Sequence, residues 1–306
     1  MKKQHLLLSF IILLAVMLVA CGTTPKAPDA GSVAQSNDYL VNVQWLNENL
    51  NTNNLLLLDA RGPESFEQGH IPGAIPVKWQ QFAKMDGAPG DTDWGTVLNA
   101  PELSAKLSEL GIDQNKTIIV YADPNGWGED GRIVWMLRMA GLTNSKMLSG
   151  GWPAWNDAKF EVSKDATTPV ASNFQVASLD LDSLATTDWL STNLDNVVIL
   201  DTRNAKEFEG ATDFGEKRGG HIPGAINIPF KDFFNNDGTI KTATEVEDIM
   251  KAKQIDKNSE IVTYCTAGIR SAHMTMILEM AGYQNVKNYD ASIYEWAAND
   301  ALPMNK

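Results

Sequence analysis

The stretch TYCTAGIRSAHM, residues 263–274, contains the side chains of this chain that are best suited to covalent chemistry. Cys265 is followed five positions later by Arg270, with Gly268 between them. A cysteine has an ordinary pKa of about 8.5 and becomes a good nucleophile only when a positive charge or converging N–H groups stabilise its thiolate. If Cys265 ends a strand and Arg270 begins a helix, the loop amides form a cradle for an anion. The spacing therefore predicts a nucleophilic cysteine next to its stabilising arginine.

The beginning of the chain has the pattern of an export signal. Lys2 and Lys3 form a basic start, and an apolar run follows at residues 6–20. This run is shorter than the ~20 residues that a membrane-spanning helix needs. A basic segment followed by a short apolar segment is typical of a secretory signal peptide. We therefore expect residues 1–20 to be removed from the mature protein.

The end of the apolar run, Leu-Val-Ala-Cys-Gly at residues 18–22, resembles the lipobox of bacterial lipoproteins. The resemblance implies that Cys21 is acylated and anchors the protein by lipid to the extracytoplasmic face of a bacterial cell membrane. Residues 21–38 are rich in Pro, Ala, Ser, Thr and Asp and are expected to form a flexible tether. The chain has two cysteines, so an acylated Cys21 would leave Cys265 without a disulfide partner. A free thiol in an oxidising compartment is then either buried and inert or used.

The charge of the chain limits its partners. Thirty-eight acidic residues against 25 basic ones give a formal net charge of −13. Because nucleic-acid binding depends on positive charge, we expect no nucleic-acid partner. The sequence also lacks a basic stripe that would bind anionic lipid, so we expect the N-terminal lipid alone to attach the protein to the membrane.

The chain repeats itself once. Residues 55–76 resemble residues 197–229, and the hexapeptide GHIPGA occurs at 69–74 and again at 220–225. The second copy carries an insertion of nine residues around 211–218. Further matched pairs are Asp59 with Asp201, Arg61 with Arg203, Tyr121 with Tyr264, Met139 with Met280, and Trp155 with Trp296. Two copies of this length indicate a duplicated domain.

We assign residues 39–160 to the first copy and residues 179–306 to the second, with a linker at residues 161–178 that is rich in Thr, Ala, Ser and Pro. Apolar runs in the second copy predict strands at residues 197–200, 225–228, 260–265 and 286–290, and helical spacing predicts helices at residues 242–253 and 271–281. Alternating strands and helices predict an α/β fold in which each copy has a parallel sheet flanked by helices. Ligands of such sheets bind beyond the carboxyl ends of the strands, where Cys265 and Arg203 are expected.

The loop from Cys265 to Arg270 resembles the active-site loop of the rhodanese, or thiosulfate sulfurtransferase, family. The two GHIPGA hexapeptides resemble the family's N-terminal signature, and residues 289–296 resemble its C-terminal one. The resemblance implies two tandem rhodanese-like domains. It also implies that only the second is catalytic, because Ala122 stands at the nucleophile's place in the first copy.

The resemblance implies transfer of a sulfane sulfur from thiosulfate to cyanide or another thiophile through a persulfide on Cys265, with no cofactor. The residues implied to act are Cys265 and Arg270 as catalytic residues, and Arg203, Thr266, Ala267, Gly268 and Ile269 as substrate-binding residues. The residues alone leave a second interpretation of Arg203 open, as a structural partner of Asp201 or Glu207. Some thiosulfate enzymes carry a lysine inside the loop, which this chain lacks, so the preferred donor stays open.

Other enzymes also use a cysteine-to-arginine loop. Related phosphatases and arsenate reductases place the arginine six positions after the cysteine, and the shorter spacing here disfavours them. Mercaptopyruvate sulfurtransferases have loops that end without arginine, so Arg270 argues against that activity. A persulfide carrier that passes sulfur to a protein partner stays open as an alternative.

Three further patterns were not assigned a function. Residues 126–131 fit G-x-G-x-x-G, but no acidic residue follows the next predicted strand to bind a ribose. Residues 123–127 begin like a calcium loop but have Trp127 at the third ligand position. His70 and His221 recur in both copies, with or without a cysteine, which predicts a scaffold role. No metal site is expected, because no Cys/His cluster has ligand spacing.

Overall fold

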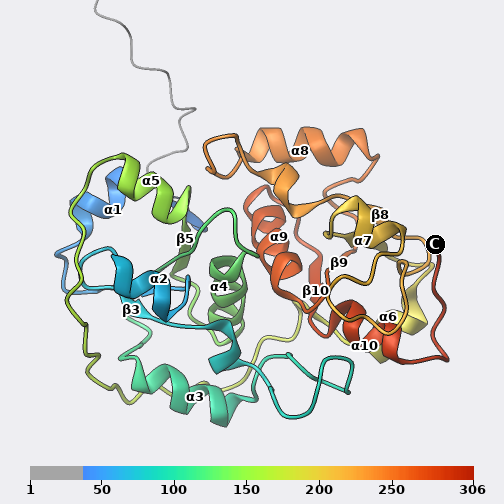
Figure 1. Ribbon diagram of the computed structural model, residues 1–306, viewed down its shortest axis with the longest axis horizontal. Coiled ribbons are helices and arrows are strands. Elements are labelled where there is room, and N and C mark those ends of the chain that lie inside the picture. The colour runs from blue at the N-terminus through green and yellow to red at the C-terminus, as the bar shows by residue number, and fades with distance from the viewer. Residues whose placement is uncertain (1–36) are drawn as a thin grey trace, which may run out of the picture. The chain divides into compact units, whose positions relative to one another are not determined.

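The computed structural model describes residues 37–306 (Figure 1). The expected signal peptide, the expected lipidation site Cys21 and nearly all of the expected tether lie outside the described residues. Within the described part, no helix is long and apolar enough to cross a membrane.

Each copy contains a five-stranded sheet whose strands all pair in parallel. The first sheet has the order β1-β5-β4-β2-β3, and the second has the equivalent order β6-β10-β9-β7-β8. The α/β fold predicted from the sequence is thus confirmed. The elements of the first copy are β1 (Leu40–Val41), α1 (Val43–Asn49), β2 (Leu55–Asp59), α2 (Pro63–Gln68), β3 (Ile75–Pro76), η1 (Trp79–Phe82), α3 (Ala100–Glu109), β4 (Thr117–Tyr121), α4 (Glu129–Met139), β5 (Ser145–Leu148) and α5 (Gly151–Asp157). Those of the second copy are β6 (Leu184–Ala185), α6 (Thr187–Asn193), β7 (Val198–Asp201), α7 (Ala205–Glu209), β8 (Ile226–Asn227), η2 (Phe230–Phe233), α8 (Ala243–Ala252), β9 (Ile261–Tyr264), α9 (Ile269–Met280), β10 (Val286–Tyr289) and α10 (Ser292–Ala298).

The predicted elements of the second copy are present, with shifted ends. Helix α8 lies inside the expected range because Thr242 caps it, accepting a hydrogen bond from the Glu245 amide. Helix α9 begins at Ile269, two residues before the expected start, so Arg270 lies in its first turn. The edge strand β6 was not predicted, since two residues carry no readable alternation.

Alternation along the central strands separates the two faces of each sheet. Leu56 and Leu58 of β2 belong to one apolar cluster, and Leu57 between them belongs to another. The first cluster is shared by the two copies, because α4 and α9 pack against each other between the sheets (Figure 1). The opposite face of each sheet has its own cluster. One continuous core therefore joins a cysteine-bearing copy to a copy without one.

The segment expected to be a linker has no regular secondary structure but is bound to the first copy. The His70 amide donates to the Ser163 carbonyl at 3.0 Å, and the Ser172 amide donates to the Ser108 carbonyl at 2.9 Å. These backbone hydrogen bonds fix the connection along the surface of the first copy.

A buried ion pair crosses between the copies. Arg132 on α4 pairs with Asp290, which follows β10, and both side chains are almost completely buried. Arg132 also donates to the Gly95 carbonyl at 3.0 Å, and Asp290 accepts from the Val97 amide at 2.9 Å. Asp290 also lies against Gly268 in the loop after β9. Through its ion pair with Asp290, Arg132 of the first copy therefore supports that loop.

Candidate active site

Backbone contacts to α10 set the conformation of the loop that follows β9. The amide of Cys265 donates to the Ser292 hydroxyl at 3.1 Å. The carbonyls of Cys265 and Thr266 accept from the amides of Ile293 and Tyr294, both at 3.1 Å. These contacts occupy the carbonyls on one side of the loop. The amides of Ala267 and Ser271, later in the same loop and helix, point to the Cys265 side chain.

Gly268 makes the tight turn into α9 possible. Its φ of +77° is left-handed, and a Cβ at this position would lie 2.3 Å from the carbonyl oxygen of Asp290. Both facts require glycine here. Gly268 is buried and does not line the pocket beside Cys265, so its role is to shape the loop backbone.

The surroundings of Cys265 favour its thiolate form. The side chain is 1% exposed, and burial alone raises the pKa of a thiol. The pKa of Cys265 is nevertheless lowered, because the Arg270 charge and the N–H groups of Ser271 and Ala267 stabilise the thiolate, together with the Ser271 hydroxyl. A buried thiolate within a ring of donors is a nucleophile and also a site where an attached sulfur is sheltered from water.

Arg270 is held by a carboxylate that the sequence did not assign to it. Its Nη1 and Nη2 atoms donate to the two carboxylate oxygens of Glu207, each at 2.8 Å, and Nη2 donates to the Thr266 hydroxyl at 2.6 Å. Burial raises the pKa of Glu207, but the hydrogen bonds from Arg270 lower it overall. Glu207, buried at 0% exposure on α7, thus fixes the guanidinium beside Cys265 and balances its charge.

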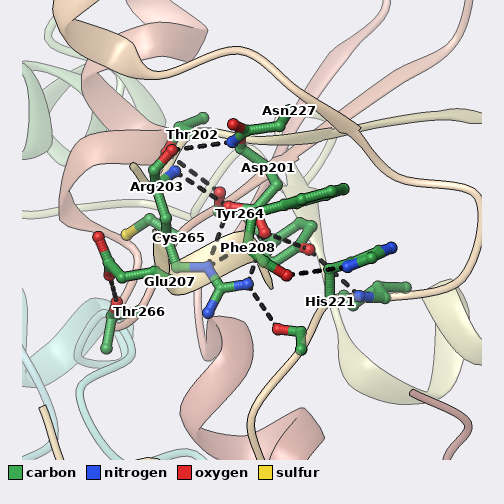
Figure 2. A network of polar contacts seen from close by, with 12 residues as sticks. Asp201, Thr202, Arg203, Glu207, Phe208, His221, Asn227, Tyr264, Cys265 and Thr266 are labelled. Atoms are coloured by element: carbon green, nitrogen blue, oxygen red, sulfur yellow. Dashed lines mark hydrogen bonds and ion pairs between the residues drawn. The ribbon is translucent and has the colours of Figure 1, made fainter. Parts of the chain in front are cut away.

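Arg203 is paired with a carboxylate of its own strand end. Its Nε and Nη2 atoms donate to the carboxylate of Asp201, and Nη2 also reaches the Gly220 carbonyl at 2.8 Å (Figure 2). The Tyr264 hydroxyl donates to the same carboxylate at 2.6 Å. Arg203 is 1% exposed and is not among the residues that line the pocket beside Cys265.

The first copy contains the same network without a cysteine. Arg61 pairs with Asp59 and donates to the Gly69 carbonyl at 2.7 Å, and the Tyr121 hydroxyl donates to Asp59 at 2.6 Å. An arrangement that is present with and without the nucleophile serves the scaffold. The pairing of Arg203 with Asp201 fits the structural interpretation, and the substrate-binding role expected from the resemblance stays a prediction.

The two repeated histidines also belong to the scaffold, as the sequence predicted. His70 stacks on Phe66 with ring centroids 3.6 Å apart, and its Nδ1 lies 2.9 Å from the Phe66 carbonyl. His221 stacks on Phe208 at 3.7 Å, with Nδ1 3.0 Å from the Phe208 carbonyl (Figure 2). In both copies the histidine ties the GHIPGA turn to the preceding helix.

A cavity of about 170 Å³ opens beside Cys265. Four of the five loop positions after the cysteine line it, namely Thr266, Ala267, Ile269 and Arg270. The rest of the wall is aromatic and comes from both copies: Trp79, Trp94 and Trp127 from the first, and Phe214 and Tyr294 from the second. Sequence reasoning missed these aromatic residues, because nothing along the chain relates the tryptophans of the first copy to Cys265.

Trp127 lies over the arginine of the other copy. The Arg270 guanidinium carbon is 5.0 Å from the centre of the Trp127 ring, within the range of a cation–π contact. Trp127 occupies the loop that fits G-x-G-x-x-G, between β4 and α4. That loop of the first copy therefore covers the cradle of the second.

Ser292 is a further residue that sequence reasoning missed. Its φ is +55°, a left-handed conformation that is uncommon for a residue with a side chain. This conformation allows the hydroxyl to accept from the Cys265 amide while it donates to the Tyr289 carbonyl at 2.8 Å. Backbone strain at a catalytic loop is a recurrent sign of function.

The chain belongs to the family of rhodanese-like domains. The family model matches residues 42–158 and 186–299, one match in each copy and together more than half of the chain. A protein of Saccharopolyspora erythraea named "Putative thiosulfate sulfurtransferase" is 29% identical over 276 residues, covering 87% of this chain and 96% of that protein. The "Sulfur carrier protein TtuD" of Thermus thermophilus is 29% identical over 287 residues, covering 88% and 97%.

Solved structures share the fold. A complex of EanB with ergothioneine superposes with a TM-score of 0.78 at 21% identity, covering 88% of this chain and 70% of that one. The crystal structure of YnjE gives a TM-score of 0.77 at 24% identity, covering 88% and 68%.

Proposed function

We propose that the protein is a sulfurtransferase that carries a sulfane sulfur on Cys265 and accepts it from thiosulfate. One observation carries the proposal: a buried cysteine whose pKa is lowered by an adjacent arginine and by inward-facing amides of a tight loop. The relatives named after thiosulfate sulfurtransfer and sulfur carriage support the same class of reaction.

The reaction has two steps in which Cys265 first gains and then loses a sulfur. The Cys265 thiolate attacks the outer sulfur of thiosulfate, the sulfur–sulfur bond of the donor breaks, and sulfite leaves with the bonding electron pair. A thiophile then attacks the outer sulfur of the persulfide, and the electron pair returns to Sγ of Cys265. The loop amides and Arg270 stabilise negative charge on the cysteine and on the departing sulfite.

Mass spectrometry of the intact mature protein tests the first step. Thiosulfate should add one sulfur to the wild-type protein, and subsequent cyanide should remove it and release thiocyanate. Mercaptopyruvate and a phosphate ester serve as controls, and faster reaction with either would reassign the substrate class. Absence of any sulfur adduct after exposure to thiosulfate would overturn thiosulfate as the donor.

Sulfur carriage to a protein partner is the second candidate function, favoured by the relative named as a sulfur carrier. The two functions differ in turnover. A carrier loads one sulfur and retains it in the presence of cyanide, whereas a sulfurtransferase releases many equivalents of thiocyanate per Cys265.

Lipid anchoring through Cys21 remains part of the proposal. The support is the Leu-Val-Ala-Cys-Gly sequence after the apolar run. In a bacterial host, the wild-type protein should partition into detergent, and the Cys21→Ala variant should either stay an unprocessed precursor, recognised by its larger mass, or be released from lipid. Partitioning is compared on protein of processed mass. Equal partitioning of the two would exclude the lipid.

A further inference from the structure

The mouth of the Cys265 cavity is made of two aromatic pairs, and each pair joins the copies. Trp94 of the first copy meets Tyr294 of the second edge to face, with ring centroids 5.7 Å apart. Trp127 of the first copy meets Phe214 of the second in the same way at 5.3 Å. Trp127 and Phe214 are nevertheless 45% and 40% exposed, so their remaining ring surface faces solvent or an arriving molecule.

The insertion that distinguishes the second copy holds Phe214 at this mouth. The Tyr294 hydroxyl donates to the Phe214 carbonyl at 2.8 Å, and the Phe214 amide donates to Glu216 at 3.1 Å. Arg218, at the end of the insertion, donates to four backbone carbonyls of residues 296–302. A surface loop fixed by this many contacts presents a preformed aromatic wall.

The charge of the cavity does not favour a cationic acceptor. Arg270 is the one charged residue among those that line it, and Glu207 balances that charge. The π faces of Trp127 and Phe214 are already turned to the Arg270 guanidinium, at 5.0 and 6.0 Å. A second cation would meet the same guanidinium at close range.

The size of the cavity suits one ring. Its volume of about 170 Å³ is close to that of an apolar cavity of about 150 Å³ that holds a benzene molecule. Flat apolar groups pack well between rings arranged edge to face.

From these contacts we infer that the sulfur acceptor is an organic thiol that bears a single aromatic or similarly flat apolar group. The inference rests on the proposed function and names the acceptor of the same site. The acceptor's thiolate attacks the outer sulfur of the Cys265 persulfide, and a new sulfur–sulfur bond forms on the acceptor. The bond to Sγ breaks, its electron pair stays on Cys265, and the product is the acceptor's persulfide. No other oxidant or reductant is needed.

The test compares acceptors in a single turnover. Protein loaded with thiosulfate is mixed with 2-phenylethanethiol, 2-mercaptoethanol or 2-(2-naphthyl)ethanethiol, and loss of the added sulfur is followed by mass spectrometry. Rates are expressed per thiolate, so differences in thiol pKa do not enter. The phenyl compound should react about tenfold faster than the hydroxyl compound or more, as filling an apolar pocket commonly gives. The naphthyl compound should gain nothing beyond the phenyl compound.

Two variants locate the preference. Phe214→Ala and Trp94→Ala should each reduce the ratio of the phenyl rate to the hydroxyl rate severalfold, because each removes one ring from the cavity wall. The ratio is measured on protein loaded with the same amount of sulfur, so any change in loading does not enter. Trp189→Ala, on the outer helix α6, is the matched control and should keep the preference. Equal rates for phenyl and hydroxyl thiols in loaded wild-type protein, or a preference untouched by both cavity variants, would overturn the inference.

A binding measurement separates this inference from the proposed function. Cys265→Ser cannot carry sulfur, yet its cavity keeps the tryptophans whose fluorescence reports occupancy. 2-Phenylethanol should change that fluorescence in Cys265→Ser and should do so less in Cys265→Ser with Phe214→Ala. Failure of thiosulfate to load the wild-type protein would overturn only the proposed function. Failure of the alcohol to bind would overturn only the acceptor class.

Discussion

The two copies share a scaffold and differ in what it supports. Both tie a strand-end aspartate to an arginine and a tyrosine, and both stack a histidine on a phenylalanine to hold the GHIPGA turn. Where the second copy has Cys265, the first has Ala122. The difference shows that the polar network does not depend on a cysteine at this place, and the proposed chemistry requires only the loop that carries Cys265.

The two copies share a left-handed backbone conformation after the last strand but differ in the residue that adopts it. Gly151 of the first copy has a φ of +51°, and Ser292 at the equivalent place has +55°. A Cβ on Gly151 would lie 2.1 Å from the Ala122 carbonyl oxygen, whereas the Ser292 hydroxyl reaches the Cys265 amide. The first copy therefore has no room for a serine at this place, but it supplies Arg132 and three tryptophans to the second copy.

The strongest test of the comparison replaces the nucleophile. Cys265→Ser should abolish sulfur transfer, because a serine hydroxyl forms no persulfide. Adding Ala122→Cys should not restore it, since the first copy has Trp127 in place of an arginine at the fifth position after Ala122. Intact mass after exposure to thiosulfate measures both, and thermal melting controls for folding. A sulfur adduct on the double variant would refute the loop as the source of the difference.

The next test breaks the support that the first copy gives. Arg132→Ala should destabilise the protein by roughly 3–5 kcal/mol, because it leaves the Asp290 carboxylate buried and unpaired. Urea unfolding measures the loss. Arg132→Met combined with Asp290→Asn should recover most of the stability, since no charge is then left alone. If Arg132→Ala unfolds like wild type, the ion pair does not couple the copies.

A smaller effect is expected at the cradle itself. Arg270→Ala should slow loading by thiosulfate about tenfold to a hundredfold, since a hydrogen bond to a charged group is worth roughly 1.5–3 kcal/mol. The acid limb of the rate should move to higher pH, because Arg270 lowers the pKa of Cys265 and its loss reduces the thiolate fraction. Arg270→Lys should recover part of the rate.

The control for this variant is set by the partner of Arg270. Removing the arginine leaves the buried Glu207 carboxylate without its ion-pair partner. Arg270→Ala is therefore compared with Arg270→Ala plus Glu207→Gln. The second should regain stability and not rate. An acid limb at the wild-type pH in both variants would show that Arg270 does not lower the pKa of Cys265.

Much of this arrangement can be predicted from the sequence, where the information is local. The alternation of strands and helices predicts the α/β class, and the five-residue spacing predicts that Cys265 and Arg270 flank one loop. Glu207 could not be paired with Arg270, because 63 positions separate them. The role of Arg203 could not be decided from the sequence, because spacing alone does not tell a scaffold ion pair from a ligand site. The tryptophans at the mouth depend on how α4 packs on α9, which periodicity does not encode.

The smallest effect is expected where Gly151 of the first copy is replaced by Ser292 in the second. Ser292→Gly gives the second copy the residue of the first, and it removes a left-handed strain of roughly 1–2 kcal/mol together with the contact to the Cys265 amide. Loading should slow about twofold to tenfold, the equivalent of one neutral hydrogen bond of roughly 0.5–1.5 kcal/mol. Ser292→Ala should slow loading equally but unfold at lower urea, because it loses the same hydroxyl and keeps the strain. Equal rates with unequal stabilities in the two variants would show that the hydroxyl affects the rate and the left-handed backbone affects the stability. A wild-type rate in both would mean that α10 positions the loop through its backbone amides alone, as Trp152 does for Ala122 in the first copy.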